Sequence, residues 1–181
     1  MKAIFLDRDG VINRYPGDGQ YVTSWKEFHF LPQVKAALRL LTSKKYPAFV
    51  ISNQAGVSKG IYNQDTLNDI TSRMLAQLKR HKAEITAVYY CTHRDEDNCS
   101  CRKPKAGLVM TAIKGAKINL PESFFIGDTI RDIETAKSAG CKSILVFSGK
   151  EKLSNRNNWQ TQPDFVFSNL YQAARFIVSK K

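Results

Sequence analysis

With 181 residues, 43% of them hydrophobic, the chain has the length of one domain and enough apolar side chains for a core without disulfides. Only four apolar residues separate Lys2 from Asp7, too few for a secretory signal, and no apolar run approaches the roughly 20 residues of a membrane span. The formal charge of +12 indicates an anionic partner, either a small phosphorylated metabolite or a nucleic acid. We therefore expect a single domain over residues 1–181 that is cytoplasmic, monomeric and without membrane contact.

Along the chain, short apolar runs alternate with amphipathic stretches, which is typical of βαβ units in an α/β domain with a mostly parallel sheet. The pattern predicts strands at 3–6, 49–52, 87–91, 124–126, 143–147 and 165–167, and helices at 32–43, 65–79, 106–117, 131–139 and, after a cap at Asn169, to about residue 179. The irregular segments 13–30, 92–105 and 150–163 lie between these elements, where binding residues usually sit.

The first predicted strand ends in two aspartates, Asp7 and Asp9, followed by Gly10. Two carboxylates at this spacing can share a divalent cation while one attacks an electrophile and the other transfers protons. Strand alternation would point them to opposite faces, so both reach one site only where the strand ends, and Gly10 gives the backbone that freedom. Taken alone, such a pair is more often a solvated turn near a helix cap.

Two further motifs offer groups that suit a phosphate. Ser52 opens the run Ser-Asn-Gln-Ala-Gly at the end of the second predicted strand, where a hydroxyl and backbone amides can cradle phosphoryl oxygens or cap a helix. Lys103 follows Arg102 in a basic loop. The lysine suits a transferring phosphoryl group and the arginine can bind a second phosphate or a carboxylate, although a solvated basic loop is the alternative.

The fourth predicted strand delivers Gly127 and Asp128 to the same edge of the sheet, with Asp132 one helical turn further on. Asp128 is the expected additional magnesium ligand. Asp132 could instead be only an acidic residue that stabilises the first turn of the following helix. Because ligands bind at the carboxyl edge of open α/β sheets, these motifs predict one site.

Three of the four cysteines crowd into eleven residues: Cys91, Cys99 and Cys101 lie near His93 in the pattern Cys-x-His-x5-Cys-x-Cys. Three thiolates and one imidazole form the ligand set of a closed tetrahedral Zn²⁺ site, and we weigh zinc above a disulfide or loose thiols. Such a site leaves no position for water, so the zinc is expected to be structural. Cys141 is expected to be a quiet core thiol.

Together, Asp7-x-Asp9, Ser52, Lys103 and Gly127-Asp128 resemble the motifs of the haloacid dehalogenase superfamily of phosphatases over most of the chain. The resemblance implies a Rossmann-like, doubly wound, essentially capless domain with a zinc-binding loop, in which Asp7 is the nucleophile and Asp9 the acid and base. It implies that Ser52 and Lys103 hold the phosphoryl oxygens. Mg²⁺ would be held by Asp7, Asp128 and the main-chain carbonyl of Asp9.

The strings DRDGVIN, SNQAGVSKG and CRKPKAG are similar to the branch of that superfamily that contains heptose 1,7-bisphosphate and histidinol-phosphate phosphatases. The substrate site implied by this resemblance is lined by Asn13, Ser52, Asn53, Gln54, Ala55, Arg102, Lys103 and Thr129, with Arg102 on the distal part of the substrate. The segment 14–22 is longer than the heptose enzymes usually carry, and the short x5 spacing of the zinc motif is nearer to the histidinol-phosphate branch.

The first expectation is therefore a Mg²⁺- and Zn²⁺-dependent phosphatase acting on D-glycero-D-manno-heptose 1,7-bisphosphate in lipopolysaccharide heptose biosynthesis, followed by histidinol phosphate. A nucleic-acid 3′-end phosphatase suits the charge, but no P-loop or basic helix with interleaved aromatics accompanies it, so we expect no nucleic-acid partner. From another class, a catalytically inactive binding protein would usually have lost an essential carboxylate or the lysine. All are present.

Overall fold

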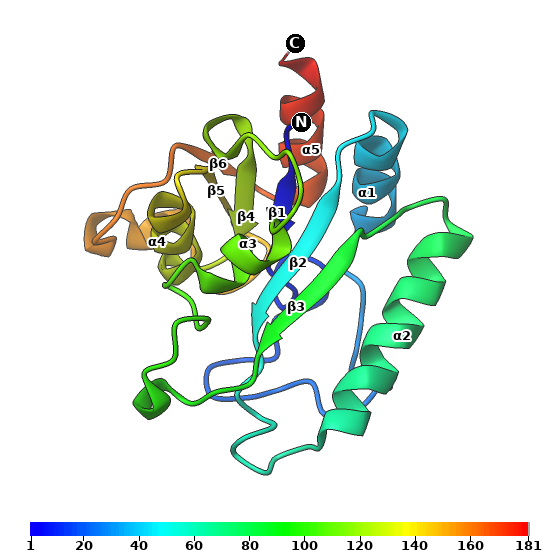
Figure 1. Ribbon diagram of the computed structural model, residues 1–181, viewed down its shortest axis with the longest axis vertical. Coiled ribbons are helices and arrows are strands. Elements are labelled where there is room, and N and C mark those ends of the chain that lie inside the picture. Colours follow the sequence, from blue (N-terminus) through cyan, green and yellow to red (C-terminus); the bar gives the residue numbers. More distant parts are fainter. Residues whose placement is uncertain (181) are drawn as a thin grey trace.

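The computed structural model describes residues 1–180 and contains a six-stranded parallel sheet between two layers of helices (Figure 1). The strands are β1 (Ile4–Leu6), β2 (Ala48–Asn53), β3 (Ala87–Cys91), β4 (Phe124–Gly127), β5 (Lys142–Val146) and β6 (Phe165–Phe167), in the order β3-β2-β1-β4-β5-β6. The helices are α1 (Val34–Ser43), α2 (Gln64–Arg80), α3 (Gly107–Ala112), α4 (Ile130–Ala139) and α5 (Leu170–Ser179). This strand order is that of a doubly wound Rossmann-like fold, as expected.

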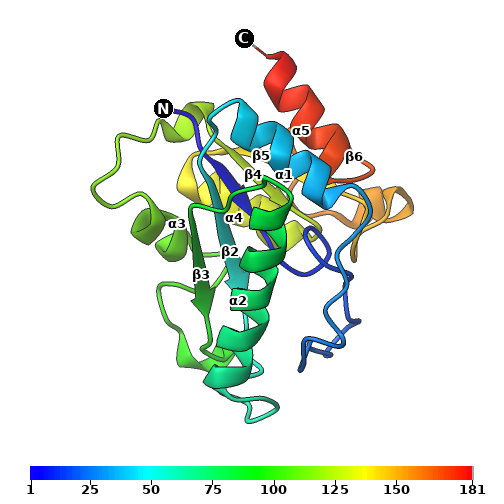
Figure 2. The ribbon, with the colours of Figure 1, turned by 90° about the vertical axis from the view of Figure 1, so that its right-hand side faces the viewer.

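Both faces of the sheet are buried, which explains why the strands read as continuous apolar runs rather than alternating ones. On one face, Ile4 and Leu6 pack with α1, α2 and α5; on the other, Phe5 packs with α3 and α4. Figure 2 shows α1, α2 and α5 on the near side of the sheet. The sheet is thereby fixed from both sides, and its carboxyl edge is a rigid support for the loops that follow the strands.

The predicted elements recur with shifted ends, and one helix is much shorter than expected. The prediction of a helix at 106–117 is wrong beyond Ala112, because the chain turns after Ile113 and Gly115 adopts a φ of +78° that cannot continue a right-handed helix. The cap at Asn169 is confirmed, since its side chain accepts a hydrogen bond from the N–H of Gln172. Short 3₁₀ turns at Asp95–Asp97, Leu120–Glu122 and Leu153–Asn158 were not predicted.

The loops that carry the sequence motifs gather at the carboxyl edge of the sheet, and both chain ends lie at the opposite edge (Figure 1). The insertion between β1 and α1 contributes no helix and no strand to the sheet, in keeping with the expected capless architecture. Among the described residues, no helix combines the length and apolar character needed to cross a membrane.

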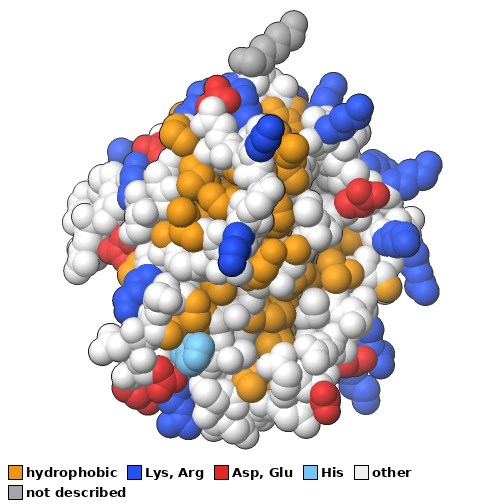
Figure 3. Space-filling model, viewed as in Figure 1, with side chains coloured by type: hydrophobic (Ala, Val, Ile, Leu, Met, Phe, Trp, Pro, Cys, Tyr) orange, Lys and Arg blue, Asp and Glu red, His pale blue; other side chains and the backbone are white. Residues whose placement is uncertain are grey.

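In the view of Figure 3, most Lys and Arg side chains lie around the periphery of the molecule, and a few stand separately among the hydrophobic side chains in the middle of this face. The positive charge on this face is therefore dispersed. A nucleic-acid backbone would be matched better by a continuous basic track.

Candidate active site

A pocket of about 420 Å³ opens at the carboxyl edge of the sheet, between the loops that follow β1, β2, β4 and β5. Seven of the residues expected from sequence line it: Asp7, Asp9, Ser52, Asn53, Lys103, Asp128 and Thr129. The remaining lining comes mainly from the segment 15–21, the start of α4 and the loop after β5. With the loop after β3, which carries Lys103, five separate stretches of sequence thus meet in one concave site, as the position at the strand ends predicts.

Lys103 is the central cation of this site and is almost fully buried. Its Nζ lies 2.6 Å from Oδ1 of Asp132 and 3.0 Å from Oδ1 of Asp7. The backbone N–H of Arg8 donates to that same oxygen of Asp7 at 2.7 Å, so Oδ1 is held by two donors. Neither donor binds the second carboxylate oxygen of Asp7, which is therefore available to a ligand in the pocket.

Asp132 binds the buried lysine and also stabilises the first turn of α4, the role that its sequence position indicated. One carboxylate oxygen binds Lys103, and the other accepts from the N–H and the hydroxyl of Thr129, at 3.1 and 2.6 Å, in a capping box that begins α4. Asp132 is fully buried beside Gly127, where a Cβ atom would come within 2.1 Å of the Cβ of Asp132. The sequence feature that could have indicated this burial is Gly127, at the end of β4 and five residues before Asp132.

Asp128 lies in a cradle made by two glycines. A Cβ atom on Gly10 would lie 2.1 Å from Oδ2 of Asp128, and one on Gly149 would lie 2.0 Å from the same oxygen. The N–H of Lys150 donates to this oxygen at 2.8 Å, while Oδ1 is buried and has no hydrogen-bond partner among the described residues. The carboxylate is therefore held from one side, and an unpaired oxygen remains for another ligand.

The donor set fits a hard divalent cation. Three buried acids offer carboxylate oxygens within 4.8 Å of one another: Asp7, Asp128 and Asp132. The ammonium group of Lys103 is the cation that pairs with them, through Asp7 and Asp132. Burial raises the pKa of Asp7 to about 6, although Lys103 opposes the shift, and burial followed by the charges of Asp132 and Asp7 raises the pKa of Asp128 well above its usual value. The excess of negative charge is what a bound cation would neutralise.

Asp9 points to a different set of donors. Arg8 reaches both of its carboxylate oxygens, with Nη2 3.1 Å from each, Asn13 donates to Oδ1 at 2.7 Å, and Gln54 donates to Oδ2 at 2.9 Å. Its carboxylate is outside the three-acid cluster, which leaves its main-chain carbonyl as the group expected to face a cation. The side chain of Asp9 still lines the pocket and is partly exposed, so it can meet a substrate.

Arg8 is a participant that sequence reasoning missed. Its side chain is completely buried, Nη1 has no partner among residues 1–180, and the guanidinium lies 5.7 Å from the centre of the Tyr90 ring. Asp9 raises the pKa of Arg8 against the effect of burial, so the arginine stays charged. A charged residue between two site aspartates is normally expected at the surface, and no sequence signal indicated burial.

Two side chains hold the basic loop near the pocket. Asn53 clamps the backbone of Lys103, accepting from its N–H at 3.1 Å and donating to its C=O at 3.2 Å. Arg102 lies outside the pocket lining and forms a two-pronged ion pair with Asp95, at 2.6 and 3.1 Å. Arg131, which does line the pocket, also approaches Asp95 at 3.6 Å, so the exposed carboxylate of Asp95 lies between the two arginines.

The remaining expected residues lie behind the pocket. Asn13 and Gln54 are buried against Asp9, and Ala55, in the loop after β2, is also buried. Their assignment to substrate contact stays a prediction. In their place, the structure adds Tyr15, Tyr21, Arg131, Lys150 and Glu151 to the lining, all from segments that the sequence left irregular or assigned to a helix start. The sequence shows that these residues are aromatic or charged, but it did not predict that they come together in one pocket.

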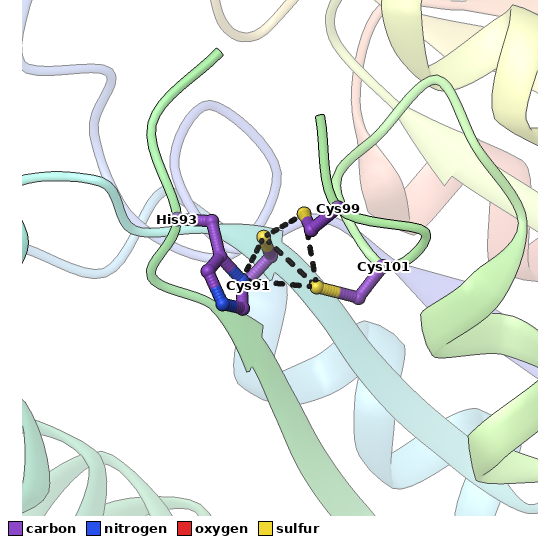
Figure 4. A group of neighbouring side chains, drawn as sticks. All are labelled: Cys91, His93, Cys99 and Cys101. Atoms are coloured by element: carbon purple, nitrogen blue, oxygen red, sulfur yellow. Dashed lines mark hydrogen bonds between the residues drawn. The ribbon is translucent and has the colours of Figure 1, made fainter. Parts of the chain in front are cut away.

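The cysteine and histidine motif forms a compact cluster (Figure 4). Cys91 ends β3, and its Sγ lies 3.6 Å from Cys99, 3.2 Å from Cys101 and 3.6 Å from Nδ1 of His93. A tetrahedral site with Zn–S bonds of about 2.3 Å needs sulfur atoms about 3.7 Å apart, close to the observed spacing. All four cysteines are free of disulfides, and the four ligand atoms converge on one point, so the donor set fits Zn²⁺.

Comparison with known proteins gives a consistent set of relatives. A HAD-hydrolase-like family model matches residues 100–173. The chain is 31% identical to the D-glycero-beta-D-manno-heptose-1,7-bisphosphate 7-phosphatase of Neisseria meningitidis, covering 99% of this chain and 96% of that protein. It is 30% identical to the D-glycero-alpha-D-manno-heptose-1,7-bisphosphate 7-phosphatase of Campylobacter jejuni, covering 99% of this chain and 97% of that protein. The crystal structure of D,D-heptose 1.7-bisphosphate phosphatase from B. bronchiseptica, complexed with magnesium and phosphate, superposes with a TM-score of 0.93 over the whole of both chains at 29% identity.

Proposed function

Because the chain belongs to the haloacid dehalogenase-like hydrolase family, we propose that it removes the 7-phosphate of D-glycero-D-manno-heptose 1,7-bisphosphate. The resemblance expected from the sequence motifs is thereby confirmed at the level of the family, and the protein is a phosphatase. The observation that carries the proposal is the pocket in which Asp7, Lys103, Asp128 and Asp9 meet.

In this proposal Asp7 is the nucleophile. Its free carboxylate oxygen attacks phosphorus in line with the leaving oxygen, the bond from phosphorus to that oxygen breaks, and an aspartyl-phosphate forms on Asp7. Lys103 has two tasks, because its ammonium holds the other oxygen of Asp7 at 3.0 Å and lies where it can neutralise phosphoryl oxygens. Ser52, buried at the end of β2 and lining the same pocket, supplies a hydroxyl for those oxygens.

Asp9 is the acid and then the base. It gives its proton to the leaving alcohol as the phosphorus–oxygen bond breaks, and it later takes a proton from the water that attacks the aspartyl-phosphate, which releases phosphate and restores Asp7. Donors from Arg8, Asn13 and Gln54 fix its carboxylate at the pocket wall. The two aspartates thus divide the work of nucleophile and proton carrier.

Two metal ions belong to the proposal. Asp7, Asp128 and the main-chain carbonyl of Asp9 would hold Mg²⁺, which when bound supplies positive charge to the phosphoryl oxygens. Cys91, His93, Cys99 and Cys101 would hold a structural Zn²⁺, since all four positions of a tetrahedral site are filled by protein. The zinc loop runs directly into Arg102 and Lys103, and so it fixes the segment that presents the lysine.

A substrate with a second anionic group is supported by the cations beyond the phosphoryl site. Arg131 and Lys150 line the pocket, and Arg102 is joined to Arg131 through Asp95. The side chain of Lys150 also binds Asp18 at 2.5 Å, which connects the loop after β5 with the segment 15–21 at the mouth of the pocket. Selection between substrates would then depend on these loops, because the fold has no separate cap domain to close over the site.

The test is phosphate release with Mg²⁺ from a panel that holds both anomers of heptose 1,7-bisphosphate, histidinol phosphate and a 3′-phosphorylated oligonucleotide. The comparison is made on kcat/KM, which measures discrimination between competing substrates. The proposal expects one heptose anomer to lead by at least about tenfold. Asp7→Asn, which keeps the size of the side chain, is the matched control and should have no turnover with any substrate.

Each other outcome has a definite meaning. Preference for histidinol phosphate or for the oligonucleotide would keep the catalytic assignment and refute the heptose assignment. Substantial activity of Asp7→Asn in clean protein would refute the nucleophile. If the protein turned over none of the panel, the alternative of a binding protein that kept the fold and lost the chemistry would be favoured.

A further inference from the structure

Asp9 receives one of its hydrogen bonds from a side chain that is itself fully buried. Gln54 is 1% exposed, and its Nε2 donates to Oδ2 of Asp9 at 2.9 Å and to Oγ of Ser52 at 3.2 Å. One amide group therefore contacts both the proposed acid and base and the proposed phosphate-binding hydroxyl. The direction in which this amide faces decides whether Asp9 meets a donor or an acceptor.

That direction is fixed from the other end by Tyr62. The hydroxyl of Tyr62 donates to Oε1 of Gln54 at 2.6 Å. Burial raises the pKa of Tyr62, so the ring keeps the proton that it donates. If the hydroxyl were absent, the carbonyl oxygen of Gln54 would be buried without this partner, and the amide would lose the contact that fixes its orientation toward Asp9.

The Tyr62 ring packs directly against Gly56, where the absence of a side chain leaves room for it. Tyr62 is 7% exposed, and a Cβ atom on Gly56 would lie 2.2 Å from Cε1 of its ring. The turn after β2 thus brings the ring back toward the end of that strand, where Ser52 lies and Gln54 follows. Tyr62 belongs to neither the pocket lining nor the expected site residues, and it reaches Asp9 only through Gln54.

We propose that Tyr62 is a positioning residue for the acid and base, acting through Gln54 to keep the carboxylate of Asp9 directed at the leaving group. The inference rests on the proposed function, in which Asp9 protonates the leaving alcohol. Proton donation matters most for an alkoxide leaving group, which leaves poorly without a proton, and least for 4-nitrophenolate, which leaves readily. Misdirecting Asp9 should therefore cost activity according to the leaving group.

The experiment compares wild type with Tyr62→Phe, which removes one oxygen atom, and with Gly56→Ala, which keeps the hydroxyl and displaces the ring. For each, kcat/KM with Mg²⁺ is measured on the preferred alkyl phosphate of the substrate panel and on 4-nitrophenyl phosphate. This parameter reports the steps up to formation of the aspartyl-phosphate, so it isolates proton donation from the later hydrolysis. Tyr171→Phe, in α5 and away from the pocket, is the matched control for removing a phenol hydroxyl.

Both variants should lose about tenfold or more on the alkyl phosphate and less than about threefold on 4-nitrophenyl phosphate, because general acid catalysis contributes on the order of 10² or more. An equal loss on both substrates, or no loss on either, would overturn the role of Tyr62. Asp9→Asn separates this result from the parent proposal. If Asp9→Asn shows the leaving-group dependence and Tyr62→Phe does not, only the present inference fails; if Asp9→Asn also lacks it, the assignment of Asp9 fails.

Discussion

Replacing Gly10 by alanine should weaken magnesium binding while the fold is kept. The new Cβ atom would start 2.1 Å from Oδ2 of Asp128, whereas an ordinary contact begins at 3.4 Å, so the two groups have to separate by about 1.3 Å. The carboxylate cannot retreat toward Gly149, because the backbone there already approaches the same oxygen. Magnesium accepts little deviation from oxygen distances of about 2.0–2.1 Å, and a shift of this size withdraws a ligand.

The matched control is Gly115→Ala. Gly10 and Gly115 have nearly the same backbone angle, with φ of +81° and +78°, so alanine should cost each of them about 1 kcal/mol of stability from strain. At Gly115, however, the new Cβ atom meets nothing within 4 Å. The difference between the two variants therefore reports the contact with Asp128 alone.

Magnesium affinity from calorimetry and activity across a Mg²⁺ titration would measure this difference, with thermal unfolding to verify that both variants fold. Gly10→Ala should lose at least about tenfold in Mg²⁺ affinity and about 100-fold in kcat/KM at saturating Mg²⁺, since a misplacement of about 1 Å has such an effect on catalysis. Gly115→Ala should match wild type in both. Equal Mg²⁺ affinity for the two variants would refute the role assigned to Asp128 and its cradle.

Other predictions test the zinc loop, the central lysine and the packing of the sheet. Cys101→Ser should reduce bound zinc below one equivalent by elemental analysis and lower Tm by at least about 5 °C, whereas Cys141→Ala should keep its zinc; a full equivalent in Cys101→Ser would contradict the clamp. Lys103→Met should lower kcat/KM by about 10²–10³-fold in steady-state assays, because it removes the charge beside Asp7, and near-normal turnover would contradict that role. Asp164 accepts two hydrogen bonds from Ser143 and pairs with Lys137. Burial raises the pKa of Asp164, but these partners outweigh it and lower the pKa below its usual value. The stability that Asp164 adds to the fold is therefore present above the unfolded pKa of about 3.9, and it is lost as the pH falls through the lower folded pKa. In urea unfolding, Asp164→Ala should therefore lower the free energy of unfolding by about 1–3 kcal/mol at pH 7 and by less below about pH 4. A difference from wild type that increased at acid pH would refute this role of Asp164.

The sequence predicted the parts of the fold that depend on local pattern. The apolar runs predicted all six strands to within one residue at each end, because strands in a sheet that is covered on both faces are predominantly apolar. The helix after Lys103 was too long by five residues, since the amphipathic pattern continued past a glycine whose left-handed backbone ends it. Periodicity alone cannot tell a glycine that is tolerated in a helix from one that terminates it.

For the site, sequence placed the ends of strands together but not the contacts between loops. Asp7, Lys103 and Asp128 were expected to meet because each follows or faces the carboxyl edge of the sheet. The burial of Arg8 and the ion pair between Lys103 and Asp132, which are 29 residues apart, depend on packing between separate elements. The contact of Tyr62 with Gln54 spans only eight residues, but it depends on the path of the irregular segment after β2. Such contacts have no periodic signature, and each involves a polar group that pattern rules assign to the surface.

The positions of the chain ends bear on how the enzyme can be handled. The ammonium group of Met1 donates to the carbonyl of Lys117, and α5 finishes on the same side of the sheet, away from the pocket (Figure 1). A tether attached at either end would therefore hold the molecule with its substrate entrance facing outward. Fusion to a second enzyme, or capture on a solid support, should leave diffusion into the pocket unobstructed.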